Sequence, residues 1–125
     1  FCFDDISIQK NHPAVAHVDH FFPHVLKRYG FGELINGIWN LVLSCPTCNG
    51  SGEKGAKVPS LSLLERLDRR NEYLIESNHP LKETVILQSG KSKKARHDFL
   101  EKKYNLALET LINDWHPVPR GDPTF

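Results

Sequence analysis

Hydrophobic residues recur every three or four positions through the second half of the chain, after Ser60. This spacing predicts two amphipathic helices whose apolar faces pack against each other. The first begins at a capping box formed by Ser62 and Glu65, and it ends near Pro80 because the residue before a proline disfavours helical dihedrals. The apolar positions are Leu64, Leu67, Leu74 and Ile75 in the first helix, and Leu100, Tyr104, Ala107, Leu108 and Leu111 in the second.

The first half of the chain lacks helical spacing and is rich in His, Cys, Gly and Asn. Two short apolar runs with β-branched and aromatic residues, at 14–18 and 38–43, predict two strands that pair in a hairpin-like arrangement. The connection from Pro23 to Asn36 is too long for a tight turn, so we expect a structured loop there. The proline-rich segment after Trp115 is expected to be extended. Together these patterns predict an α+β fold.

Composition narrows the class of protein. A chain of 125 residues that is 39% hydrophobic can bury one core, so we expect a single structural unit. We place a strand-containing core at 1–59 and a helical extension packed on it at 60–125. The formal net charge of +1 argues against a strongly basic, non-specific nucleic-acid binder. We interpret the basic run at 91–103 as a solvated helix face.

The first residues and the length of the apolar stretches indicate the cellular location of the protein. Phe1 is not a natural start, so we expect the chain to be part of a longer protein, with other domains or subunits upstream of Phe1. No apolar stretch approaches the roughly 18 residues that a membrane span needs, and the first residues lack the order of a signal peptide. We therefore expect a cytoplasmic protein without a membrane partner.

The first candidate for chemistry is the adjacent pair Asp19 and His20. Hydrolysis of a phosphodiester needs an activated water and a cation held against the scissile phosphate. A histidine can take the proton from water, and carboxylate or amide oxygens suit a hard cation such as Mg²⁺. Neighbours on a regular strand point to opposite faces, so the two share a cleft only where the strand ends, and Pro23 favours an end there. Alone, the pair also fits a capping aspartate beside a packed histidine.

Cysteines mark a second candidate motif. Cys45 and Cys48 form a Cys-x-x-Cys pair, and Cys2 makes the count odd, which argues against a closed disulfide framework. Metal ligation is therefore the interpretation that we favour. Asn40 precedes the pair and Asn49 follows it directly, so one short segment holds an apolar strand, a two-cysteine knuckle and two amides.

Taken with Asp19 and His20, this segment resembles the HNH, or ββα-metal, endonucleases. Their pattern is a hydrophobic-Asp-His-x-x-Pro strand end, a middle Asn before an apolar strand, and a closing His or Asn. The resemblance covers residues 1–59 and includes the order, the intervening length and the embedded cysteine pair. It implies a small ββα-metal nuclease core with a zinc knuckle, acting as a divalent-metal-dependent endonuclease on DNA, with RNA not excluded.

The resemblance implies a role for each matched residue. His20 is the general base for water, and Asp19 and Asn49 are ligands of a catalytic Mg²⁺ or Mn²⁺, since oxygen donors favour these ions over softer ones. Asn40 holds the loop that carries His20 through hydrogen bonds to the backbone. His17 shares the strand face of Asp19, and it is either a residue that supports the site or contacts phosphate, or a structural histidine.

Many members of this family also hold a structural zinc with two Cys-x-x-Cys pairs. Cys45 and Cys48 match the second pair, whereas in the first pair Asp5 stands where the cysteine after Cys2 belongs. Three alternatives stay open. Zinc is bound by the three cysteines and Asp5, because carboxylate is an acceptable zinc ligand; or His12 replaces Asp5; or the structural metal has been lost.

The sequence leaves three candidate functions for this chain. The one we favour is the nuclease module of a larger restriction or phage-defence protein. The second is a zinc-knuckle module that binds nucleic acid or protein without catalysis, and the third is a structural role with inert cysteines. Lys54 and Lys57 lie where relatives often carry basic residues, so each is either a phosphate contact or an ordinary surface lysine.

Overall fold

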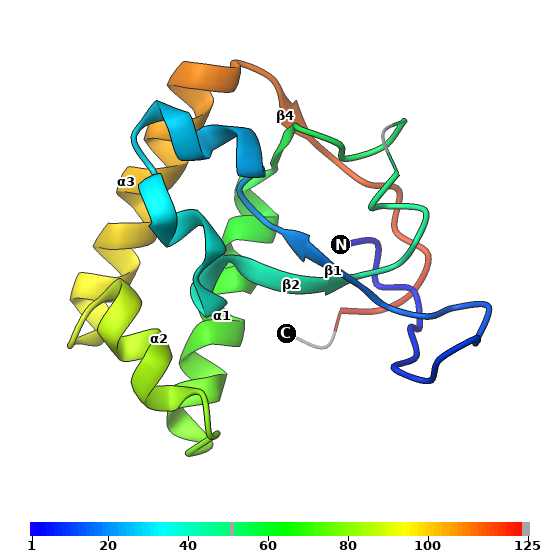
Figure 1. The fold of residues 1–125 in the computed structure, drawn as a ribbon, viewed down its shortest axis with the longest axis horizontal. Helices are drawn as coiled ribbons and strands as arrows, with labels where there is room; N and C mark the ends of the chain where they lie inside the picture. The colour runs from blue at the N-terminus through cyan, green and yellow to red at the C-terminus, as the bar shows by residue number, and fades with distance from the viewer. Residues whose placement is uncertain (51, 124–125) are drawn as a thin grey trace.

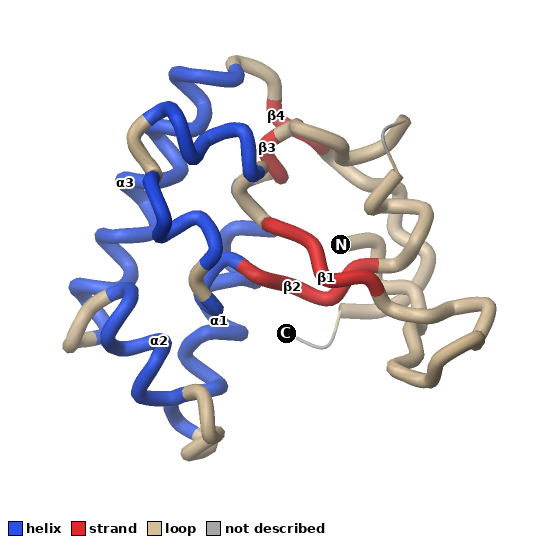
Figure 2. The backbone as a smooth tube through the Cα atoms, in the orientation of Figure 1, coloured by secondary structure: helices blue, strands red, loops and turns tan. Residues whose placement is uncertain are grey.

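Two short strands lie at the centre of the first half of the chain (Figure 1; Figure 2). The computed structural model describes residues 1–50 and 52–123. In it, β1 (His17–His20) and β2 (Leu41–Ser44) pair antiparallel. The predicted pairing is therefore confirmed, but both strands begin later than predicted and continue one or two residues further.

The residues before each strand take other conformations for local reasons. The N–H of Ala16 donates to the carbonyl of Ser7 at 2.7 Å, so this stretch pairs with the N-terminal segment instead of with β2. Before β2 the chain forms a 3₁₀ turn, η3 (Ile38–Asn40). Within it the indole N–H of Trp39 donates to the carbonyl of Leu34 at 2.9 Å, which holds the turn against the preceding loop.

The connection between the strands is structured, as predicted, and consists mostly of 3₁₀ turns. The first, η1 (His24–Tyr29), ends at Gly30, whose φ of 100° is a left-handed conformation that glycine adopts without strain. The second is η2 (Gly32–Asn36). Leu26 and Ile35 are fully buried, so both turns are attached to the core by an apolar side chain.

Two long helices confirm the pair predicted from the apolar spacing. They are α1 (Leu61–Glu76) and α3 (Lys93–Leu111), and they contact each other. The predicted capping box is wrong, because Ser62 lies inside the first turn. Ser60 is the residue that caps α1, and its carbonyl accepts the N–H of Leu64 at 3.1 Å.

A third helix, α2 (Lys82–Ser89), was not predicted. It begins two residues after Pro80, where the sequence pattern only indicated the end of the previous helix. Val85 and Ser89 are its buried residues, which is too little apolar surface to produce a recognisable stripe.

A short parallel pair connects the two halves of the chain. β3 (Val58–Pro59) pairs with β4 (Asp114–Trp115), and the N–H of Ser60 donates to the carbonyl of Trp115 at 2.9 Å. The described residues after Trp115 form neither helix nor strand. The pairing of Asp114–Trp115 was not foreseen. Because the two strands are far apart in sequence, no local pattern indicates that they meet.

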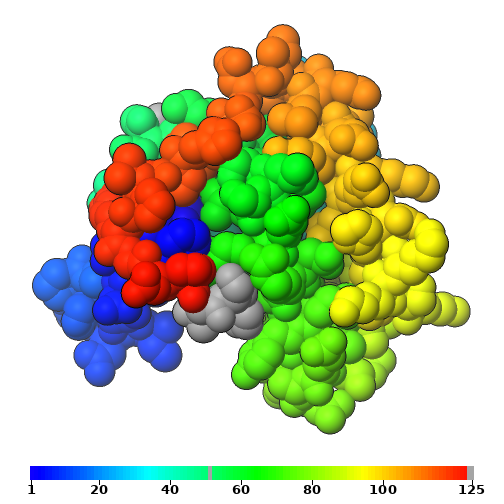
Figure 3. All heavy atoms as spheres, turned by 180° about the vertical axis from the view of Figure 1, so that it is seen from behind, coloured from blue at the N-terminus to red at the C-terminus, as the bar shows by residue number. Residues whose placement is uncertain are grey.

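The C-terminal segment lies against the N-terminal residues (Figure 3). The N–H of Arg120 donates to the carbonyl of Cys2 at 2.6 Å. The two segments are so close that a Cβ atom added at Gly121 would collide with the carbonyl oxygen of Phe3. The tail therefore holds in place the segment that carries Cys2.

One apolar core spans the segments on both sides of residue 60. The ring of Phe22 lies 5.4 Å from that of Phe31, 5.8 Å from that of Trp39 and 6.5 Å from that of Tyr104 on α3. Trp39 is fully buried, which contributes about 4–6 kcal/mol at the usual free energy per area of buried apolar surface. Among the described helices, none combines the length and the apolar composition that crossing a membrane requires.

Most of the basic run at 91–103 lies in the first part of α3, and most of it is exposed, as predicted. Arg96 is the exception. It is buried and makes two hydrogen bonds to the carboxylate of Glu72 on α1, at 2.6 and 3.0 Å. One member of the predicted solvated face is therefore part of the contact between the two long helices.

Candidate functional site: a cysteine cluster and a polar strand end

Three cysteines converge where the N-terminal segment meets the turn after β2. The sulfur atoms of Cys2, Cys45 and Cys48 all lie within 4.8 Å of one another, and all three residues are buried. The Sγ atoms of Cys2 and Cys45 are 3.6 Å apart. Thiolates at this spacing suit a soft, tetrahedrally coordinated ion such as Zn²⁺, so the group has the chemistry of a metal site with three protein ligands.

The predicted fourth ligand is not among these converging atoms. Asp5 is exposed, and it lines a cavity of about 340 Å³ that Cys2 and Cys45 also line. His12, the alternative ligand, is exposed and accepts the N–H of Ala14 at 3.0 Å. The structure thus brings Asp5 to the neighbourhood of the thiols, while its role as a ligand stays a prediction.

The three thiols are not equivalent. Burial, together with the neighbouring cysteines, raises the pKa of Cys48 to about 12. Burial alone would also raise the pKa of Cys45, but hydrogen bonds from Cys48 and Cys2 and the charge of Arg120 bring it below the usual value. Cys45 therefore holds a negative charge more easily than Cys48.

The second group of predicted residues lies along β1. His17 and Asp19 are two positions apart on the strand and therefore share a face. The turn after β2 contacts this face, where the amide nitrogen of Asn49 lies 3.0 Å from Nδ1 of His17. Because an amide nitrogen donates, Nδ1 of His17 is the acceptor of this hydrogen bond.

Asp19 has an unusual environment for a carboxylate. Its Oδ2 atom is buried without a hydrogen-bond partner among the described residues. The ammonium of Lys54 lies 3.6 Å away, which is an ion pair without a hydrogen bond of ordinary length. That ammonium instead donates to the carbonyl of His20 at 2.6 Å. A buried carboxylate oxygen left in this way is suited to accept a further cation.

Lys54 does not occupy the surface position that the sequence suggested. Its side chain is 1% exposed, and its ammonium lies 5.6 Å from the centre of the Phe1 ring. Burial lowers the pKa of Lys54, and the neighbouring Asp19 opposes that shift. In this position Lys54 stabilises the end of β1 instead of meeting phosphate, whereas Lys57 is exposed and remains a candidate for that contact.

Asn40 is fully buried and makes three hydrogen bonds to backbone atoms. Its Oδ1 accepts the N–H of Phe22 at 2.7 Å, and its Nδ2 donates to the carbonyls of Phe22 at 3.1 Å and Ile35 at 2.8 Å. These are contacts of the kind that the resemblance implies for the middle Asn, because Phe22 lies in the loop directly after His20.

His20 ends β1 and has different partners from Asp19. Its Nε2 lies 3.0 Å from Oδ1 of Asn36, and its ring makes an edge contact with that of His24, with 5.2 Å between the centroids. Asn36 was missed by the sequence analysis. It lies in the connection between the strands, and no local pattern distinguishes an amide that binds a histidine from one in an ordinary turn.

Two side chains of α1 were also missed as parts of the site. Arg70 donates to the carbonyl of Leu41 at 2.9 Å and to those of Ile38 and Trp39 at 3.2 and 3.3 Å, and Asn71 donates to Trp39 at 3.1 Å. Burial lowers the pKa of Arg70 to about 10. The helix therefore satisfies the carbonyls at the start of β2 and fixes the strand that pairs with β1.

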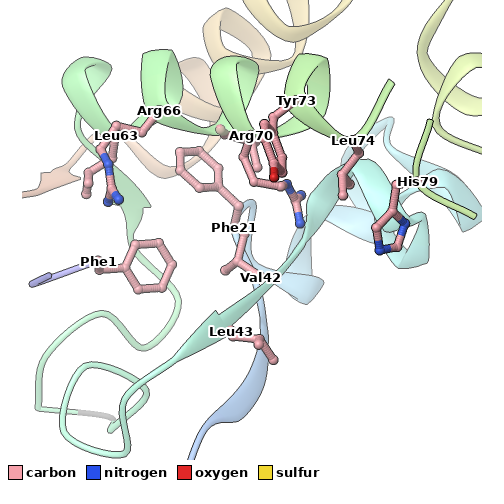
Figure 4. A pocket seen from close by; sticks show the side chains of 11 residues that line it. Phe1, Phe21, Val42, Leu43, Leu63, Arg66, Arg70, Tyr73, Leu74 and His79 are labelled. Atoms are coloured by element: carbon pink, nitrogen blue, oxygen red, sulfur yellow. The ribbon is translucent and has the colours of Figure 1, made fainter. Parts of the chain in front are cut away.

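An apolar cavity of about 450 Å³ lies between β2 and α1 (Figure 4). Figure 4 shows Phe21 and Leu43 on the strand side and Arg70 and Tyr73 on the helix side. None of the residues predicted to bind metal or nucleic acid is among the described residues that line it.

Comparisons with models of protein families, with curated proteins and with solved structures found no match to this chain. The assignment of a function therefore depends on the chemistry of the residues described above.

Proposed function

We propose that this chain is the nuclease module of a divalent-metal-dependent endonuclease of the HNH class, acting on DNA. The observation that carries the proposal is Oδ2 of Asp19, a buried carboxylate oxygen without a hydrogen bond. It lies on the strand face where His17 holds the amide of Asn49. An oxygen donor set of this kind suits Mg²⁺ or Mn²⁺.

We infer that the elements around this oxygen make up a ββα-metal core. β1 and β2 supply the two strands, and the turn that carries Asn49 follows β2 directly. The N–H of Asn49 donates to the carbonyl of Cys45 at 3.1 Å, four residues back, but the described residues between β2 and β3 form turns and no α-helix. We assign this turn to the position of the metal-binding helix of the family.

The reaction would be hydrolysis at phosphorus. A water oxygen forms the new bond to phosphorus, His20 accepts the proton of that water, and the ester bond to the leaving sugar oxygen breaks, with solvent supplying its proton. The divalent ion, when bound by Asp19 and Asn49, supplies positive charge that stabilises the negative charge developing on the phosphate. Asn40 keeps the loop after His20 in place, and Lys57 is available to contact a neighbouring phosphate.

The cysteine cluster serves as a scaffold in this proposal. Zn²⁺ held by Cys2, Cys45 and Cys48 would join the N-terminal segment to the turn that carries Asn49, with Asp5 or water as the fourth ligand. Since Asn49 follows Cys48 directly, the zinc would also fix the position of the second catalytic ligand.

A cleavage assay tests the proposal. Zinc-loaded protein is incubated with supercoiled plasmid and Mg²⁺ or Mn²⁺, and nicked and linear products are measured. We expect His20→Ala to lower the rate about 100-fold to 10,000-fold, the range for loss of a general base. The exposed His116 provides a matched control, and His116→Ala should cleave at the rate of the original protein. Equal rates for the two variants would contradict the role of His20.

One observation favours a second candidate, a binding module without catalysis. The ammonium of Lys54 already places a positive charge beside Asp19, so the pair is compatible with a structural role in which no divalent ion is needed. In that case the protein would bind nucleic acid or a protein partner through its surface, and it would not bind Mn²⁺ at Asp19. A metal titration separates the two candidates.

A further inference from the structure

Arg70 on α1 carries a positive charge that the proposed function does not use. Its Nη atoms donate to the backbone carbonyls of Ile38, Trp39 and Leu41. Its Nε atom is buried without a hydrogen-bond partner among the described residues, and no described carboxylate forms an ion pair with it. Burial lowers its pKa to about 10, so the guanidinium stays charged near neutral pH. Arg70 is therefore a partly buried positive charge without an anion beside it.

Arg96 on α3 shows the usual way in which such a charge is stabilised. It is buried and makes two hydrogen bonds to the carboxylate of Glu72, at 2.6 and 3.0 Å. A charged group removed from water is costly unless an opposite charge and hydrogen bonds compensate for the lost hydration. Arg70 lacks a carboxylate, and its Nε atom lacks an acceptor. An anion bound beside Arg70 would supply both.

The cavity of about 450 Å³ between β2 and α1 has room for that anion. Its volume falls within the range of roughly 300–1,000 Å³ that is typical of pockets for small organic molecules. Figure 4 shows Arg70 and Tyr73 on the α1 side of this cavity and Val42 and Leu43 on the β2 side. Among the described residues, the lining contains arginine but neither aspartate nor glutamate. The cavity therefore combines an apolar wall with positive charge.

The lining also favours one kind of anion. Most of its side chains are leucine, valine or phenylalanine. Inorganic phosphate or the polar edges of a nucleotide base would lie against this wall without hydrogen-bond partners, which is unfavourable. An alkyl or aryl group is instead stabilised by burial there, and a single carboxylate is a good partner for a guanidinium. The cavity thus fits a molecule with an apolar body and one acidic group.

We propose that the cavity between β2 and α1 binds a small organic anion with an apolar body, such as a medium-chain or aromatic carboxylate, whose acidic group pairs with Arg70. This binding site is separate from the residues assigned to catalysis and does not depend on the nuclease function. Arg70 donates to the carbonyl of Leu41, which pairs with His20 in the register of β1 and β2. A bound anion should therefore stabilise the strand pair and raise the Tm of the protein.

The first test compares octanoate, octanol and octylammonium, which share one apolar chain and carry a negative, a neutral and a positive head group. Calorimetric titration of zinc-loaded protein, in buffer without Mg²⁺ or Mn²⁺, measures the three affinities. We expect one saturable site for octanoate. Binding of the other two probes should be at least about tenfold weaker, the usual effect of losing a hydrogen bond between charged groups. Absence of saturable octanoate binding, or equal affinity for octylammonium, would overturn the proposal.

Nuclear magnetic resonance of ¹⁵N-labelled, zinc-loaded protein locates the octanoate. We expect changes in the backbone amide signals of β2 and of α1, including those of Leu43 and Leu67, which line the cavity. A carboxylate can also bind zinc. Changes confined to the cysteine cluster would mean that octanoate binds the metal and not the cavity, and they would overturn the proposal.

A variant near Arg70 tests the role of its charge. Arg70 itself holds three carbonyls at the start of β2, so replacing it would disturb the strand directly. Tyr73→Glu instead places a carboxylate three residues further along α1, at an exposed position that lines the cavity. We expect octanoate affinity to fall at least about tenfold, because the new carboxylate repels the anion and competes with it for Arg70.

Tyr29→Glu is the matched control, because Tyr29 is also exposed but is not among the residues that line the cavity. It should bind octanoate like the original protein. Unchanged octanoate affinity in a folded Tyr73→Glu variant would overturn the proposal. So would a dimer of the original protein that dissociates in Tyr73→Glu, measured by size-exclusion chromatography, since a second copy of the chain would then be the occupant of the cavity.

Discussion

The segment before Ser60 and the helical segment after it are stabilised in different ways. In α1, α2 and α3 the backbone satisfies its own hydrogen bonds, and apolar side chains join the helices. In the first segment, side chains distant in sequence satisfy the backbone, as Asn40 does for Phe22 and Lys54 for His20. Single polar side chains should therefore matter most in the segment that carries the proposed site.

The largest effect should follow loss of a cysteine. Cys48→Ser removes one of three converging sulfur ligands, and because metal binding is coupled to folding, we expect loss of bound zinc and a fall in Tm of about 10 °C or more. Metal analysis measures the bound zinc, and thermal unfolding measures the Tm. The exposed neighbour Thr47 offers a control, since Thr47→Ser should keep the metal and the Tm. A stable, zinc-free Cys48→Ser variant would show that the cluster does not stabilise the fold.

The next largest effect should come from Asn40. Asn40→Ala leaves the polar backbone groups of Phe22 and Ile35 buried without partners, and we expect the free energy of unfolding to fall by about 3–5 kcal/mol. Denaturant unfolding measures this change. Asn105→Ala, at an exposed position, should change stability by less than about 0.5 kcal/mol. A similar loss of unfolding free energy in the two variants would contradict the proposed difference between the segments.

In the helical segment the corresponding polar contact is the ion pair of Glu72 with Arg96, whose N–O distance is 2.6 Å. Glu72→Gln should cost about 2–3 kcal/mol of folding free energy, because it leaves the buried guanidinium without a carboxylate. The control variant is Glu109→Gln, at an exposed position on α3. Neither variant should alter Mn²⁺ binding, since the pair lies outside the proposed site. A matched loss of Mn²⁺ affinity would mean that the two segments are more tightly coupled than proposed.

A small, pH-dependent effect should come from His97 on α3. A hydrogen bond with Asp68 at 3.1 Å raises the pKa of His97 above its ordinary 6.5. The folded-state pKa is higher than the unfolded one, so this stabilisation is complete below about pH 6.5 and is lost as pH rises through the folded pKa. Asp68→Asn should therefore destabilise the protein more at pH 6 than at pH 8.5. An equal difference at both pH values would contradict this assignment.

The same contrast explains what the sequence could predict. Helical spacing identified α1 and α3 because their buried residues recur regularly, as Leu64 and Leu67 do. α2 was not predicted because it buries few apolar side chains. β3 and β4 were not predicted because their pairing depends on residues far apart in sequence. Regular, local patterns were thus predictable, and long-range contacts were not.

The candidate site shows the same limit of local patterns. The motif drew attention to Asp19, His20 and Asn49, whose spacing along the chain is a property of the sequence. It gave no indication of Asn36 or of the buried position of Lys54, because both depend on how the connection and the turn after β2 fold back on β1. A contact between side chains that are far apart in sequence produces no local pattern from which a single sequence could predict it.

The most direct test of the account is the binding of Mn²⁺ to zinc-loaded protein, followed by electron paramagnetic resonance or calorimetry. Asp19 and Asn49 are proposed to bind the ion, whereas His20 is not. We therefore expect one saturable site, at least about tenfold weaker binding in Asp19→Asn and Asn49→Ala, and unchanged binding in His20→Ala. Absence of saturable binding, or equal affinity in Asp19→Asn and the original protein, would contradict a catalytic metal site at the end of β1.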